Sequence, residues 1–88
     1  MNKGNIKVIY YVDTKDNTKG TLCAIPSNED IRSTVVQLAI SDEIKSAFAH
    51  NSIVSIHSNS IASSITHYDY ASMGDYEFGV EEIPLIEC

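Results

Sequence analysis

The sequence has few cysteines, no long apolar run and no leader-like N-terminus, and each absence excludes a class of protein. Only two cysteines occur in 88 residues, at positions 23 and 88, too few for the disulfide framework of a small secreted domain. No run approaches the roughly 18 apolar residues of a membrane-spanning helix, and the first apolar run is too short and too polar for a signal peptide. We therefore expect a cytoplasmic protein that binds no membrane, with Cys23 as a small buried hydrophobe.

Local signatures of chemistry are missing as well. The histidines at 50, 57 and 67 match no common zinc spacing, although His67 and Asp69 would share one face of a strand. No Gly-x-Ser-x-Gly elbow places a serine beside a base, and the four glycines form no phosphate-binding loop. We therefore expect no catalytic residues, no cofactor and no native metal site.

Basic residues are missing from the whole second half of the chain. All six lie at or before position 45, where six acidic residues balance them, so the net charge of −6 belongs to residues 46–88. A face of this sign repels nucleic acid and anionic lipid and attracts a basic protein surface. The charge argues against direct binding of nucleic acid. Two interpretations of the acidic half remain: it binds a basic protein partner, or it serves solubility alone.

Two segments near the N-terminus predict a β-hairpin over residues 6–25. Residues 6–12 are rich in β-branched and aromatic side chains. Apolar residues occur at both even and odd positions, so both faces of the strand would be apolar, which favours an interior strand. Ile9 and Tyr11 would lie on one face. The other face would carry Ile6, Val8, Tyr10 and Val12. Turn-forming Asp, Asn and Gly follow, and residues 21–25 return as the second arm.

Residues 28–50 predict one or two helices. Ser27 is a suitable N-cap, and Ile31, Val35 and Leu38 follow at helical spacing and would face the core. The β-branched run at 34–36 leaves a strand over 34–40 as the alternative. Ile44, Ala47 and Phe48 project to the opposite side of that helix, so we expect a break near Ser41 and a second helix that ends at Asn51.

The remaining residues predict at least one further strand. Residues 52–70 favour neither helix nor strand, since isoleucines at helical spacing alternate with many serines. In a strand over 75–83, Tyr76, Phe78 and Val80 would face the core, and Asp75, Glu77 and Glu81 would face water. Pro84 is typical of an edge strand. Residues 1–88 thus predict a single small α+β domain: a mainly antiparallel sheet covered on one face by one or two helices.

Tyrosines interleave with carboxylates over residues 66–84, and this pattern predicts a partner-binding surface. Tyrosine supplies rigid contact area, and arginine of a partner can bind carboxylates bidentately. The candidate partner-binding residues are Tyr68, Asp69, Tyr70, Asp75, Glu77, Glu81 and Glu82. The plainer interpretation is a solvated face that serves solubility alone.

The leading hypothesis is a non-catalytic intracellular inhibitor that occupies a basic surface of a partner, of the kind that holds nucleic acid. Small acidic proteins of phages and mobile elements that disarm host nucleases have this size and charge, which is an analogy and not a family match. The alternative is a homo-oligomer that binds a small ligand between protomers, because residues 53–70 carry Ile and Tyr side chains that a monomer would leave exposed.

Overall fold

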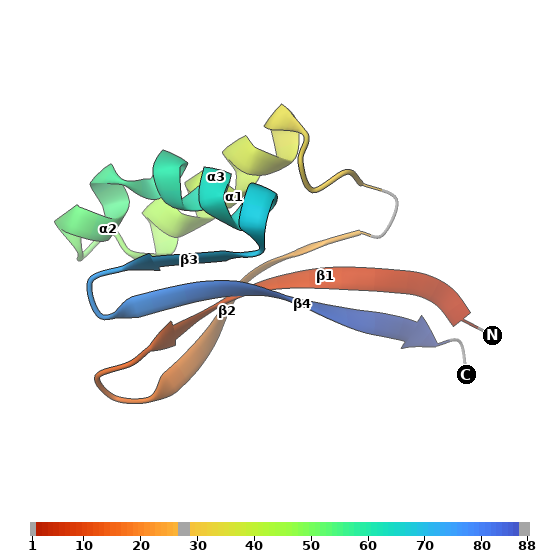
Figure 1. Ribbon diagram of the computed structural model, residues 1–88, viewed down its shortest axis with the longest axis horizontal. Helices are drawn as coiled ribbons and strands as arrows, with labels where there is room; N and C mark the ends of the chain where they lie inside the picture. The colour runs from red at the N-terminus through yellow and green to blue at the C-terminus, as the bar shows by residue number, and fades with distance from the viewer. Residues whose placement is uncertain (1, 27–28, 87–88) are drawn as a thin grey trace.

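The computed structural model describes residues 2–26 and 29–86, which form an α+β fold as the sequence predicts (Figure 1). The elements in chain order are β1 (Asn2–Asp13), β2 (Thr18–Ile25), α1 (Thr34–Ala47), α2 (Ser52–Ile56), α3 (Ser58–Tyr68), β3 (Tyr70–Met73) and β4 (Tyr76–Ile86). The strands make one antiparallel sheet in the order β2-β1-β4-β3. All helices of the described residues lie on the same face of this sheet (Figure 1).

The N-terminal hairpin and the interior position of β1 are confirmed. β1 pairs with β2 on one side and, over almost its whole length, with β4 on the other. Ile9 is fully buried beneath the helices, whereas Val8 and Tyr10 are half-buried on the other face. The sequence pattern of two apolar parities therefore reflects a central strand with one face covered by helices and one face without them.

Helix α1 is continuous, so the predicted break at Ser41 is wrong. Its buried stripe is Val36, Ile40 and Ile44, while Val35 and Leu38 are 76 % and 54 % exposed. Starting the stripe at Val36 instead of Val35 rotates it by about 100°. The stripe then leads directly to the buried Phe48, and one straight helix buries a single face.

Polar side chains fix the ends and the middle of the helical segment. Ser33 caps α1 by accepting a hydrogen bond from Val36 N at 3.2 Å, and the predicted cap Ser27 lies outside the described residues. Buried Ser41 lies on the α3 side of α1, where its hydroxyl donates to Asn59 Oδ1 at 2.6 Å. Asn51 does not end a helix. It caps α2, because its side chain accepts from Val54 N.

The ambiguous residues 52–70 are mostly helical. α3 buries Ile61, Ala62 and Ile65 against α1 and the sheet, and it ends at Asp69, which adopts the left-handed conformation with φ 59°. The chain then turns directly into the short strand β3. β3 makes β4 an internal strand at its start, so the predicted edge position is wrong for residues 76–79.

A cluster of aromatic rings joins the helices to the centre of the sheet. Phe48, at the end of α1, makes edge-to-face contacts with Tyr11, Tyr76 and Phe78 at centroid distances of 5.1, 4.8 and 5.7 Å. The predicted core-facing parity of β4 is thereby confirmed for Tyr76 and Phe78. The carboxylates of the opposite parity consequently lie on the face without helices.

Candidate partner-binding face

The face of the sheet that no described helix covers is the candidate site, and we call it the open face. Residues directly opposite one another in an antiparallel pair lie on the same face, so the strand register gives its composition. Three rows cross it from β2 towards β3: Lys19, Val12, Glu77 and Ser72; Thr21, Tyr10, Gly79 and Tyr70; and Ala24, Val8 and Glu81. Ile6 and Ile83 continue it beyond the third row.

Two tyrosines occupy the middle row of the open face, one on each side of Gly79. The Tyr10 ring lies over Gly79, since a Cβ at this position would stand 2.5 Å from the Tyr10 hydroxyl oxygen. Tyr70 pairs with Gly79 from β3 and is 50 % exposed. A glycine between two aromatic side chains leaves room for their rings and makes this part of the sheet surface rich in aromatic area.

One lysine crosses the open face from β2 to β4. Lys19 Nζ lies 3.4 Å from Glu81 Oε1 and 4.4 Å from the centroid of the Tyr10 ring. Both side chains of the ion pair are about half exposed. Within the described residues, Glu77 has no such partner, so the carboxylate free to meet a basic group is Glu77.

Three of the residues predicted from the sequence, Tyr70, Glu77 and Glu81, share the open face. Asp75 lies at its end, in the turn between β3 and β4, where its backbone carbonyl accepts hydrogen bonds from the amide and hydroxyl of Thr14. The Asp75 carboxylate is left exposed at the edge of the face.

The other three predicted residues lie elsewhere. Tyr68 and Asp69 form the junction of α3 with β3 beside Tyr70, and Tyr68 is 79 % exposed. Glu82 points to the opposite face of the sheet, where Asn5 Nδ2 donates to its carboxylate at 3.1 Å. The seven residues predicted from the sequence therefore do not form one surface, because the acids divide between two faces of the sheet and Lys19 pairs with one of them.

The sequence interpretation missed Tyr10 and Lys19 as part of this surface. Both belong to the charge-neutral first half, and they reach the acidic strand only because β4 returns between β1 and β3. The apolar parity of Val8, Tyr10 and Val12, opposite to that of Ile9, was the signal for a second exposed or partnered face of β1.

Other chemistry has little support in the described part of the chain. His57 and His67 each place Nδ1 within 2.9 Å of the backbone carbonyl one helical turn earlier, and His50 stacks on Phe48. No three metal-ligating side chains gather in residues 2–26 and 29–86. None of the helices there has both the length and the apolar character needed to cross a membrane.

Comparison with protein-family models, with curated proteins and with solved structures finds no match to this chain. No activity or partner can be transferred from a relative. The function has to be argued from the open face itself.

Proposed function

We propose that this protein is a non-catalytic binding protein whose open face occupies a basic protein surface of the kind that holds nucleic acid. The observation that carries the proposal is the arrangement of Glu77 and Glu81 around the tyrosine pair Tyr10 and Tyr70 on a sheet face without helices. The role is that of an inhibitor, since a surface filled by this protein is closed to its nucleic acid.

The chemistry of the open face suits arginine more than any other partner side chain. Glu77 and Glu81 are four residues apart on β4, about 13 Å along the strand, with Gly79 between them, which leaves room for two separate guanidinium groups. Each guanidinium can bind a carboxylate bidentately and stack on a neighbouring tyrosine. Phosphate groups present the same sign of charge to such a surface, so the protein and a nucleic acid would compete for it.

The decisive experiment compares carboxylates on the two faces of one strand. The double variant Glu77→Gln/Glu81→Gln removes the Glu77 and Glu81 carboxylates from the open face, whereas Glu82→Gln removes a carboxylate from the neighbouring position on the opposite face. Each protein is immobilised, and partners are captured from a cell lysate at about 0.05 M and 0.3 M salt, a range over which screening changes strongly. Captured proteins are purified, and their affinities for the three proteins are measured.

We expect basic partners whose affinity falls about tenfold or more in the double variant, remains within about twofold in Glu82→Gln, and weakens with salt. A DNA duplex should displace the wild-type protein from its partner. Equal capture by the wild type and the double variant, with unchanged thermal unfolding, would refute the proposal. So would a wild-type dimer that buries the open face against a second copy, which equilibrium sedimentation detects.

A further inference from the structure

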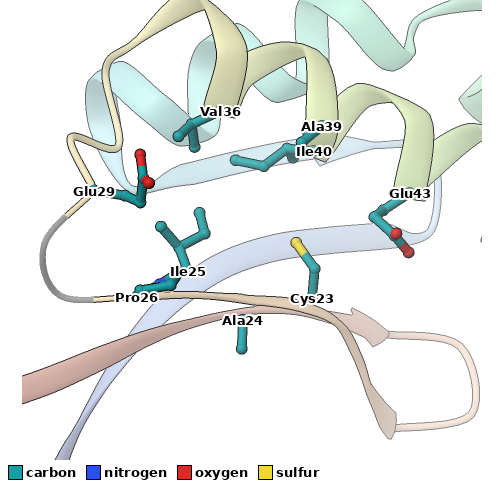
Figure 2. Close-up of a pocket in the computed structure, with 9 residues that line it drawn as sticks. All are labelled: Cys23, Ala24, Ile25, Pro26, Glu29, Val36, Ala39, Ile40 and Glu43. Carbon is teal, nitrogen blue, oxygen red and sulfur yellow. The ribbon is translucent and has the colours of Figure 1, made fainter.

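A pocket of about 280 Å³ lies between β2 and α1, on the opposite side of the sheet from the open face (Figure 2). Cys23 and Ile25 point into it from β2, and Val36 and Ile40 point into it from α1, whereas the Ala24 side chain points away (Figure 2). β2 is one of the two edge strands of the sheet, so the pocket lies at an edge of the helix-covered core.

The pocket has an apolar interior and an acidic rim. Ile25, Val36 and Ile40 supply its floor and roof. Glu29 and Glu43 stand at its two ends (Figure 2), and among the residues that the structure describes no lysine, arginine or histidine lines it. Neither carboxylate has an ion-pair partner among the residues that the structure describes. A ligand that filled this pocket would place its apolar body between two unneutralised negative charges.

The thiol in the pocket is a neutral group and not a nucleophile. Burial, with a smaller contribution from the nearby Glu43 carboxylate, raises the pKa of Cys23 to about 11. The thiol thus remains protonated at neutral pH, when a reactive cysteine would form thiolate. Covalent chemistry at Cys23 is therefore disfavoured at neutral pH.

From this geometry we infer that the pocket between β2 and α1 binds a small apolar primary amine, its ammonium group held by Glu43 or Glu29 and its apolar body between Cys23 of β2 and Ala39 of α1. The volume equals that of roughly nine liquid waters at about 30 Å³ each, and it is near the lower limit of ordinary ligand pockets. The ligand is accordingly small, of the size of an arylalkylamine. Anions of the same shape are excluded, because both rim groups would repel them.

The test uses a pair of probes that differ only in the charged end. Phenethylamine, with about nine non-hydrogen atoms, is titrated into the protein and followed by amide chemical shifts, and 3-phenylpropionate serves as the anion. We expect saturable shifts centred on Cys23 and Ala39 with a dissociation constant of about 1 mM, in the range open to a ligand of this size, and no saturable shifts with the anion.

Variants then test whether Glu29 and Glu43 hold the ammonium group. Glu29→Gln/Glu43→Gln should weaken phenethylamine binding about three- to tenfold, while the matched double variant Glu77→Gln/Glu81→Gln on the open face should leave it unchanged. Equal binding of amine and anion, shifts centred on another surface, or no binding at 10-fold excess over about 1 mM would each overturn the inference. Failure here leaves partner capture by the open face untouched, so the two proposals are separable.

Discussion

Lys19 is the residue whose replacement distinguishes most sharply between a structural and a binding role for the open face. Its ammonium lies 3.4 Å from the Glu81 carboxylate and 4.4 Å from the centroid of the Tyr10 ring, which is where a basic group of a partner would bind. The protein therefore holds a cation of its own in the middle of its acidic surface. Lys19→Gln removes the charge and keeps part of the apolar stem.

The magnitude follows from the exposure of these contacts. An ion pair between half-exposed side chains contributes about 0.2–1 kcal/mol, and an exposed cation–π contact adds about 0.5–1 kcal/mol. Lys19→Gln should thus lower the free energy of unfolding by about 1–1.5 kcal/mol. The same change frees Glu81, so affinity for a basic partner should rise about threefold, equivalent to about 0.7 kcal/mol. Stability and binding move in opposite directions.

The assay is urea unfolding of the wild type, Lys19→Gln, Glu81→Gln and the double variant, at about 0.05 M and 0.5 M salt. The cycle isolates the coupling between the two side chains, which we expect to be about 0.2–1 kcal/mol at low salt and smaller at high salt. Partner affinity is measured on the same four proteins. A coupling near zero together with unchanged affinity for Lys19→Gln would refute the idea that Lys19 and a partner compete for Glu81.

Two further outcomes test the fold and the pocket. Phe48→Ala should lower the free energy of unfolding by about 3–5 kcal/mol, because it removes the ring that joins α1 to the sheet, and Ile56→Ala, at a side chain 77 % exposed, should change it by less than about 0.5 kcal/mol. In a Cys88→Ser background, alkylation of Cys23 should accelerate about tenfold per pH unit until pH is about 11. The unfolded chain loses the thiol proton first, so Cys23 stabilises the fold fully below pH 9.0 and progressively less from there to about 11.

Strands β1, β2 and β4 were predictable because their signals are local. Alternation of Tyr76 and Phe78 with Glu77 assigns the two faces of β4, and two apolar parities place β1 inside the sheet. The order of the strands was not predictable. β3 has only four residues, and it follows α3 without an intervening loop that the sequence would reveal. The pairing of β3 with β4 depends on the tertiary fold. Because of this pairing, residues 76–79 of β4, which we expected to form an edge strand, lie inside the sheet.

In the helical half, moving the start of the buried stripe by one residue changes the predicted structure. Val35 and Val36 are adjacent apolar residues, and either can begin a stripe. Choosing Val35 requires a break at Ser41, whereas choosing Val36 needs none. The deciding interaction is not local, since the hydroxyl of buried Ser41 is satisfied by Ser58 and Asn59 of α3. A lone serine in a helical pattern therefore identifies a cap only where no partner helix can satisfy it.

The candidate site divides in the same way between local and long-range information. Glu77 and Glu81 were found from alternation along one predicted strand, and Tyr70 from the interleaving of tyrosines with carboxylates, whereas Tyr10 and Lys19 join them only through the strand order. Sequence position also grouped Glu82 with Glu81, although successive residues of a strand point to opposite faces. The alternation of side chains along a strand already places Glu81 and Glu82 on opposite faces, and it is a better guide to a shared surface than adjacency in the sequence.

The two proposed sites are physically consistent with each other because both depend on the same imbalance of charge. On the open face, one lysine stands among two glutamates, and the pocket on the opposite side has two glutamates and no basic side chain. Anionic ligands are disfavoured at both. The sites differ in shape: the open face is a sheet surface that offers aromatic area to a large partner, whereas the pocket is small enough for one side chain or amine. Since β1 and β2 separate them, a charge removed from one site should alter cation binding there and leave the other within about twofold.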